Sequence, residues 1–251
     1  MRGKKVSAGF PANFLWGAST SGHQVEGGLV DQWTRWEKHI ANTSARTASD
    51  RYKHYQSWPI IRSQASDPRN YIAGSGIAHE KLYKQDFRLL KKLNLNSFRF
   101  SIEWSRLEPK EGQWDKEAIR YYKQYIHELR SLGIEPVANL WHWTNPLWFE
   151  DMGAFTKRSN LKYFERFVRK VADEILDEVT YVVTINEANN YSLFGYFAGY
   201  WPPGKRNSLL GVISTINLMS AHKRSYDLLK SKDSSHRVGI AHNVAANVPK
   251  S

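Results

Sequence analysis

A chain of 251 residues with 41% hydrophobic and 24% charged residues can bury a sizeable core, which excludes long disordered stretches. It contains no cysteine, which excludes disulfides, thiolate metal ligands and cysteine nucleophiles and fits a reducing compartment. The formal net charge of +12 would suit a polyanion, but the basic residues are spread over the polar faces of several expected helices. We therefore expect a solvated surface and no nucleic-acid partner.

Residues 1–10 are positively charged but contain no apolar run of signal-peptide length, and nowhere do 18 apolar residues follow one another. We expect a cytoplasmic protein without membrane contact, folded as a single domain over residues 1–251. No zinc-finger spacing and no phosphate-binding glycine loop occurs, and we expect neither a metal nor a cofactor. Aromatic residues make up 14% of the chain, which fits either a sugar-binding pocket or a Trp-rich core.

Strand and helix patterns alternate along the chain. Short apolar or β-branched runs predict strands at 14–19, 97–103, 134–140, 180–185 and 237–241. Apolar residues at helical spacing predict helices at 80–93, 115–132 and 159–175, and Asp115 and Ser159 are the expected caps of two of them. A fourth helix is expected at about 208–230. A long, polar, Trp-containing stretch up to about residue 78 follows the first strand and is too long to be a passive connection.

Single strands that alternate with helices predict right-handed βαβ crossovers and a parallel sheet. Polar clusters at the strand ends favour a (β/α)8 TIM barrel over a Rossmann sheet, whose glycine fingerprint is missing. Only about four βα units and a fifth strand can be assigned, whereas a closed barrel needs eight units. We therefore expect the first half of the barrel of a larger enzyme.

The fourth strand, which is almost entirely β-branched or aromatic, ends at Asn186 and Glu187. Strands that are covered on both faces carry their chemistry at the carboxyl end, and an adjacent amide and carboxylic acid suit acid/base chemistry on a polyol. The alternative is that Asn186 and Glu187 are ordinary turn residues. Further signals at the other strand ends favour the functional interpretation.

The other strand ends also carry polar side chains. A Gly-rich turn after the first strand holds Gln24 and Glu26, and the alternation of the second strand directs Arg99 into the barrel interior. A buried arginine needs a carboxylate, so a structural salt bridge to Glu103 or Glu187 is the alternative to a catalytic role. The third strand ends at His142 between two tryptophans, where hydrogen bonding to a hydroxyl is favoured over metal binding.

These residues resemble the motifs of the family 1 glycoside hydrolases, which include β-glucosidases, β-galactosidases and 6-phospho-β-glycosidases. The matching segments, in order, are 10–19 (FPANFLWGAS), 24–27 (QVEG), 98–106 (FRFSIEWSR), 140–146 (LWHWTNP) and 184–187 (TINE). Similarity in this order covers nearly the whole chain except for residues 44–78, where agreement is scattered. Five ordered motifs form a specific match.

The resemblance implies a retaining β-glycosidase, of the β-glucosidase kind, that hydrolyses O-glycosidic bonds of a β-glycoside or oligosaccharide. It implies Glu187 as general acid/base and Asn186 as the ligand of the sugar 2-hydroxyl. Gln24 and His142, with Trp143, are implied to bind the glycone, and Arg99 to contact the nucleophilic carboxylate. In the family that nucleophile lies on the seventh strand in a Glu-Asn-Gly context.

Two features depart from the family pattern. The chain contains no Glu-Asn-Gly, so we expect it to lack the nucleophile half, to be inactive alone, and to self-associate or need a complementary carboxyl-terminal half. Ala188 stands where the family usually has proline, which removes a restriction on the backbone of Glu187. The alternative hypothesis is a non-catalytic half barrel that binds carbohydrate. The sequence leaves the glycone open among glucose, galactose and 6-phospho-sugars.

Overall fold

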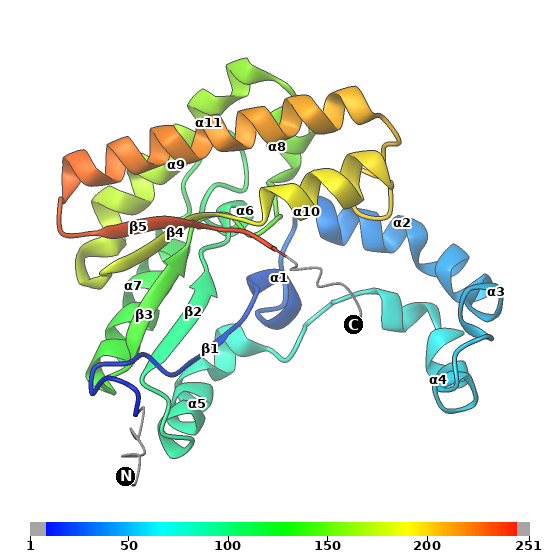
Figure 1. Ribbon diagram of the computed structural model, residues 1–251, viewed down its shortest axis with the longest axis horizontal. Coiled ribbons are helices and arrows are strands. Elements are labelled where there is room, and N and C mark those ends of the chain that lie inside the picture. The colour runs from blue at the N-terminus through cyan, green and yellow to red at the C-terminus, as the bar shows by residue number, and fades with distance from the viewer. Residues whose placement is uncertain (1–8, 245–251) are drawn as a thin grey trace, which may run out of the picture.

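The computed structural model describes residues 9–244, and all strands in this range belong to one parallel sheet (Figure 1). The five strands are ordered in space as they are in sequence. They are β1 Gly17–Ser19, β2 Ser97–Ser101, β3 Glu135–Asn139, β4 Tyr181–Asn186 and β5 Arg237–Ala241. The five expected strands are confirmed, although β1 is shorter than expected. Residues 1–8 and 245–251 of the expected domain lie outside the described residues.

Long helices connect successive strands and confirm the four that were expected. They are α5 His79–Lys92, α7 Lys116–Ser131, α9 Leu161–Glu174 and α11 Ser208–Lys232. Short helical segments follow the strand ends, namely α1 Gly22–Val25, α6 Trp104–Leu107, α8 Leu147–Asp151, α10 Ala188–Ser192 and a π-helical turn, Leu193–Phe197. Strictly parallel pairing with a helix in each crossover is the repeat of a (β/α) barrel.

The expected helix caps are correct in one case and wrong in the other. The carboxylate of Asp115 accepts hydrogen bonds from the amides of Glu117 (2.8 Å) and Ala118 (3.1 Å), which satisfies two free donors at the start of α7. Ser159 does not cap α9, because the chain first forms a 3-10 turn, Arg158–Asn160, and the helix begins only after it. The side chain of Asn160 instead donates to backbone carbonyls of the preceding segment.

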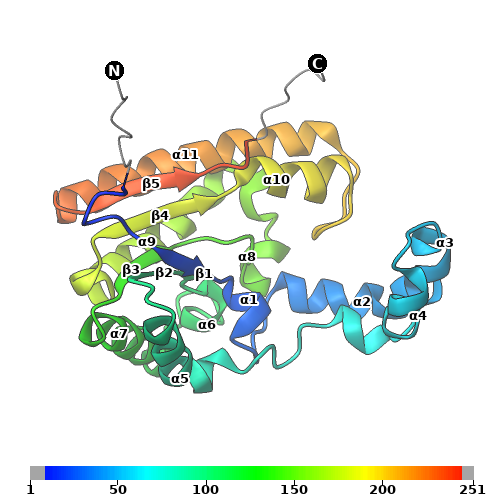
Figure 2. The same cartoon turned by 60° about the horizontal axis from the view of Figure 1, so that its bottom comes forward.

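The long connection after β1 contains three helices that its polar sequence did not reveal. They are α2 Gln32–Arg46, α3 Ala48–Tyr52 and α4 Trp58–Ala65, followed by a 3-10 turn, Pro68–Tyr71. Asp31 starts α2 with a capping box, in which its carboxylate accepts from the Thr34 amide at 2.8 Å. We call residues 32–71 the arm, because α2 leads away from the sheet to α3 and α4 (Figure 2).

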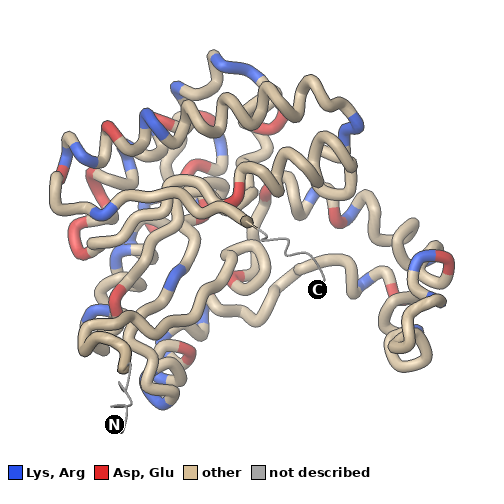
Figure 3. The backbone as a smooth tube through the Cα atoms, viewed as in Figure 1, with Lys and Arg blue, Asp and Glu red and all other residues tan. Residues whose placement is uncertain are grey.

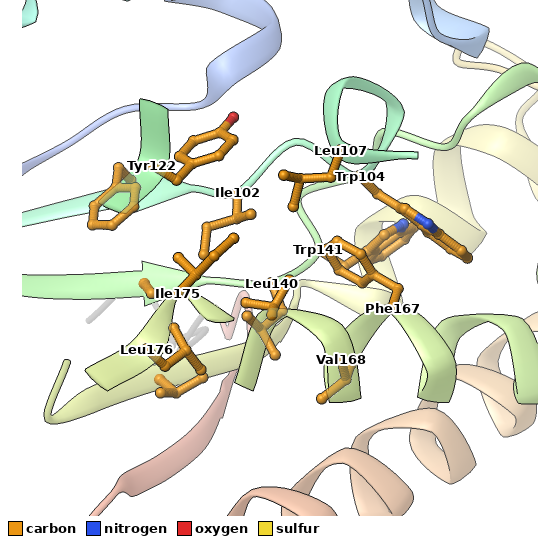
Figure 4. Close-up of a cluster of buried hydrophobic side chains, with 14 of the residues drawn as sticks. Ile102, Trp104, Leu107, Tyr122, Leu140, Trp141, Phe167, Val168, Ile175 and Leu176 are labelled. Atoms are coloured by element: carbon orange, nitrogen blue, oxygen red, sulfur yellow. The ribbon is translucent and has the colours of Figure 1, made fainter. Parts of the chain in front are cut away.

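One face of the sheet is packed against the helices. Phe98 and Phe100 of β2 are 4% and 2% exposed, and their rings contact Phe87 and Tyr125 at centroid distances of 5.6 and 4.8 Å. The core continues past the strand ends, where Figure 4 shows Trp104, with other large apolar side chains, between the strands and the helices. Burial of each such side chain contributes roughly 1.5–3 kcal/mol, so this face holds the layers together.

The opposite face of the sheet is more open. Arg99 of β2, Val137 of β3 and Val183 of β4 alternate with the helix-facing residues and are only half buried. Within residues 9–244, β1 pairs only with β2, and β5 only with β4. The sheet therefore presents an incompletely covered face and two strand edges, as a partial barrel does.

Charges of both signs are distributed over the whole surface. Figure 3 shows Lys and Arg interspersed with Asp and Glu along the helices instead of gathered in one segment. Many lie in ion pairs between exposed groups, such as Lys223 with Asp227 and Lys232 with Asp173.

In the described part of the chain, no helix combines the length and the apolar character needed to cross a membrane.

Candidate active site

Glu187 lies immediately after β4, at the point where the chain turns into α10. Its backbone is left-handed, with φ 45° and ψ 58°, a conformation that a non-glycine residue adopts only when its surroundings hold it. Its amide donates to the carbonyl of Ala241 on β5 at 2.8 Å. The side-chain amide of Asn190 donates to Glu187 Oε2, also at 2.8 Å. Glu187 is thus fixed by contacts from two elements, although alanine follows it in place of proline.

Arg99 and Asn186 meet across the open face of the sheet. Arg99 Nη2 donates to Asn186 Oδ1 at 2.6 Å, and the Trp143 indole donates to the Asn186 carbonyl at 2.9 Å. The expected partner of Arg99 was a carboxylate, and the structure instead gives it a neutral amide. Burial lowers the pKa of Arg99 and the charge of Glu187 opposes that shift, which places Glu187 within electrostatic reach of the guanidinium.

Arg99 retains an unsatisfied donor, because its Nε is buried without a hydrogen-bond partner among the described residues. A buried donor without a partner costs about 1–3 kcal/mol. The guanidinium of Arg99 is therefore only partly satisfied by its hydrogen bond to Asn186.

Glu103, the other expected partner of Arg99, is held elsewhere. Its carboxylate accepts from Ser101 Oγ at 2.6 Å and from Thr144 Oγ1 at 2.7 Å. Burial raises the pKa of Glu103, and these two hydrogen bonds oppose the shift. Gly22 packs against it so closely that a Cβ there would lie 2.4 Å from Glu103 Oε1. Glu103 therefore joins β2, α1 and the loop after β3, and the Arg99–Glu103 salt bridge does not form.

His142 lies beside this centre as a neutral imidazole. Burial, reinforced by the charge of Arg99, lowers the pKa of His142 to about 4. Its Nδ1 is buried without a partner among residues 9–244, and its ring stands edge-on to Trp143 at 5.0 Å. A neutral imidazole can donate from one nitrogen and accept at the other, which suits a hydroxyl ligand.

Tryptophan side chains line the side of the site that faces the arm. The Trp143 ring lies 4.6 Å from that of Trp201, which in turn lies 5.6 Å from Trp33. The Trp33 indole donates to the Trp143 carbonyl at 3.0 Å. Sequence analysis missed Trp33, Trp201 and Asn190. The position of Asn190, three residues after Glu187 at the start of a helix, was the available signal for it.

Gln24 lies in α1 with an exposed side chain. The structure brings Arg99, Asn186, Trp143 and Glu187 into one connected set but shows no hydrogen bond between Gln24 and any of them. The element that carries Gln24 is nevertheless well fixed. The neighbouring His23 bridges Asp31 at 3.1 Å and Glu37 at 2.8 Å, which anchors α1 to α2.

The remaining buried carboxyl groups have protein partners away from Arg99. Glu26 accepts from Tyr122 and from Arg106, and burial together with Glu103 raises its pKa to about 8. Glu150 accepts from Asn145 at 2.9 Å. Among the residues described, no group of three or more His, Asp or Glu side chains could hold a metal ion. Glu187 is therefore the carboxylate best placed for chemistry at the strand ends.

Comparison with known proteins identifies the family. The model of Glycosyl hydrolase family 1 matches residues 6–251. The chain belongs to this family. Its curated relatives include the human cytosolic beta-glucosidase, 31% identical over 238 residues, and a chloroplastic benzoxazinoid glucoside beta-D-glucosidase of Zea mays, 31% identical over 261 residues. These matches cover 92% and 96% of the chain but 47% and 43% of the relatives, so the chain spans about half their length.

Solved structures confirm the partial barrel of the glycosyl hydrolase family 1 fold. The beta-glycosidase from Pyrococcus horikoshii superposes with a TM-score of 0.79 at 33% identity, covering 96% of this chain and 50% of that one. The beta-glucosidase from Thermotoga maritima gives a TM-score of 0.80 at 24% identity, with 96% and 51% covered. The expected fold class, a (β/α)8 barrel represented by its first units and fifth strand, is correct.

Proposed function

We propose that this chain supplies the acid/base half of a retaining β-glycosidase, β-glucosidase-like in its substrates, with Glu187 as the general acid/base. The observation that carries the proposal is the position of Glu187. It follows β4 directly, lies within electrostatic reach of Arg99, and is held by Asn190. In this role Glu187 protonates the departing glycosidic oxygen and later removes a proton from water.

The neighbouring side chains divide the remaining tasks. Asn186, fixed by Arg99, binds the sugar hydroxyl next to the anomeric carbon. His142, neutral at pH 7, and Gln24, exposed on α1, bind other hydroxyls of the glycone. Trp143 offers an indole face to the sugar ring. Hydrogen-bonding and aromatic groups of this kind fix the orientation of a polyol, which is the contribution that a binding site makes to rate.

The nucleophile comes from a complementary carboxyl-terminal half, which covers the open face of the sheet. A retaining mechanism needs a second carboxylate about 5–5.5 Å from the first. Arg99 supports such an arrival, because within residues 9–244 its half-buried guanidinium has only one side-chain hydrogen bond, to Asn186, and can offer a charge-assisted hydrogen bond to an incoming carboxylate. That partner is a second polypeptide segment, since a copy of this chain would bring no nucleophile, and the β-glycoside binds between the halves.

A half barrel that binds carbohydrate without hydrolysis is the second candidate. It is favoured by one observation, namely that the buried carboxylates Glu26, Glu103 and Glu150 are each held by hydrogen bonds to other protein groups and so are not free to serve as a nucleophile. We also propose a cytosolic location, which fits the absence of cysteine and the similarity to the human cytosolic beta-glucosidase.

The test is complementation. The purified chain is mixed or co-expressed with the carboxyl-terminal half of the Pyrococcus horikoshii enzyme, and hydrolysis of β-glucosides is measured. We expect negligible turnover by the chain alone and turnover with retention in the complex. Glu187→Gln lowers turnover of unactivated glucosides by about 10²–10⁴-fold, the usual contribution of general acid catalysis. Glu117→Gln, which removes an exposed carboxylate on α7, is the control. Unchanged turnover in a folded Glu187→Gln complex contradicts the assignment.

A further inference from the structure

A groove of about 690 Å³ lies between the arm and residues 198–207, which we call the loop and which follow the π-helical turn after α10. Its volume falls in the range of small-molecule sites, roughly 300–1,000 Å³. Ile40 and Ser44 of α2 and Tyr52 of α3 line one side, with Tyr71 beyond them. This part of the arm belongs to the stretch in which the resemblance to family motifs is scattered. The stretch of scattered resemblance thus supplies Ser44, Arg51, Tyr52 and Tyr71 to the groove.

The groove is aromatic on both sides. Tyr52 and Tyr71 of the arm face Tyr200 and Trp201 of the loop. Tyr71 is fixed by a hydrogen bond from its hydroxyl to the Ala65 carbonyl at 2.8 Å. Aromatic walls of this kind bind flat rings by offset stacking or edge contacts, each worth about 0.5–1.5 kcal/mol beyond the area buried.

Two arginines, Arg51 of α3 and Arg206 of the loop, give the groove its charge. No acidic residue lines it. Within residues 9–244 the ion pairs involve other arginines, and neither Arg51 nor Arg206 has a carboxylate partner. Unpaired, exposed guanidinium groups that line a concave surface together with aromatic rings favour a ligand with a planar anionic group such as a carboxylate.

The groove adjoins the candidate active site through a single side chain. Trp201 lines the groove and also packs on Trp143 at 4.6 Å, and Trp143 donates to the Asn186 carbonyl. The loop is held against the arm, because Gly204 packs on the Trp36 ring. A Cβ on Gly204 would lie only 2.1 Å from the nearest ring carbon of Trp36. A ligand in the groove therefore rests against the same aromatic wall as a sugar bound next to Glu187.

We propose that this groove binds an aromatic ring bearing an anionic substituent, as the leaving-group end of the β-glycoside. The identification of the bound ring as a leaving group rests on the proposed function. Binding itself does not, since the groove would bind a free aryl carboxylate as well. Arg51 and Arg206 pair with the anion, while Tyr200 and Trp201 contact the ring.

The test is calorimetric titration of the full chain with 4-carboxyphenyl β-D-glucoside and with its neutral methyl ester. We expect the acid to bind about tenfold more tightly, the effect of one charge-assisted hydrogen bond in a partly exposed place. Arg51→Gln and Arg206→Gln each reduce this ratio, the double variant brings it close to one, and Arg206→Lys retains part of it. Both arginines are exposed, so these variants keep the fold.

Arg62→Gln is the matched control, because Arg62 is an exposed arginine of the same arm that does not line the groove. Equal affinity for acid and ester, or an equal loss in Arg62→Gln, overturns the proposal. Two further titrations separate it from the proposed function. Binding of 4-hydroxybenzoate that depends on Arg51 and Arg206, without binding of the iminosugar deoxynojirimycin, upholds the groove and counts against the glycosidase site. Iminosugar binding without any preference for the aryl anion does the opposite.

Discussion

The side-chain amide of Asn190 donates a hydrogen bond of 2.8 Å to Glu187 Oε2. The two residues are joined by one helical turn at the start of α10, so the amide reaches back over the strand end. Glu187 has no proline after it to restrict its backbone. The amide of Asn190 and the carbonyl of Ala241 supply the restraint instead, from the helix and from β5.

We therefore expect Asn190→Leu to lower turnover of unactivated glucosides by about tenfold in the complemented barrel, with KM little changed. The reason is that loss of one hydrogen bond to a carboxylate costs roughly 1.5 kcal/mol and leaves the acid less well aimed. Asn189→Leu is the control, because the amide of this exposed neighbour donates to the Asn243 carbonyl instead. Steady-state kinetics with both variants checks the prediction, and equal losses in the two would show that the contact has no special role.

The open sheet face predicts association. Arg99, Val137 and Val183 are half buried on the side away from the helices, and β1 and β5 each have one paired neighbour in the described range. We expect the isolated chain to sediment as dimers or larger species and to bind hydrophobic dyes, since apolar faces and unpaired strand edges recruit partners. Addition of a complementary half is expected to abolish both. A monomer that does not bind the dye would argue against an open face in solution.

Periodicity predicted the elements well but not the contacts between them. The strand containing Arg99 and the strand ending at Asn186 were both recognised, because alternation and β-branched runs fix which face a side chain takes. Which side chain it meets depends on the register of strands β2 to β4, and the sequence could not show that Arg99 donates to Asn186 and not to Glu103.

The arm and the aromatic wall were missed for a related reason. Helices α2 to α4 lie in a stretch recognised only as long and polar, α3 and α4 are short, and their positions depend on tertiary contacts such as the bridge of His23 to Asp31 and Glu37. Trp33 of α2 and Trp201 of a loop are 168 positions apart in the chain by their numbers, so no local pattern joins them.

The charged cluster of His23 predicts how stability depends on pH. Although burial disfavours its charge, hydrogen bonds to Asp31 and Glu37 raise the pKa of His23 to about 10 from 6.5. Its contribution is fully present below pH 6.5 and is lost as pH rises towards 10. The pKa of Glu26 is raised to about 8 from 4.5, so stability also falls as this group ionises in the folded state between pH 4.5 and 8.

We therefore expect the denaturation midpoint to fall continuously from about pH 5 to pH 10, with the part above pH 8 due to His23. His23→Gln should flatten the curve between pH 8 and 10, whereas His127→Gln, at an exposed histidine paired with Glu178, should leave it unchanged. Urea titrations at several pH values provide the measurement. A wild-type midpoint that rises over this window would show that the cluster is not charged as described.

The role of Glu187 can be isolated from that of its partner half by chemical rescue. If Glu187 is the proposed general acid/base, Glu187→Ala in the complemented barrel leaves the carboxylate that forms the glycosyl-enzyme intact but removes the group that assists departure and activates water. A substrate with a good leaving group needs no proton to depart, so the glycosyl-enzyme should still form while its hydrolysis stalls. Added azide needs no base, and we expect it to restore turnover and to yield a β-glycosyl azide, identified by NMR. Full activity of Glu187→Ala on unactivated disaccharides, or absence of rescue in a folded complex that still releases the good leaving group, would leave Asn186 and Glu187 as the end of a strand and nothing more.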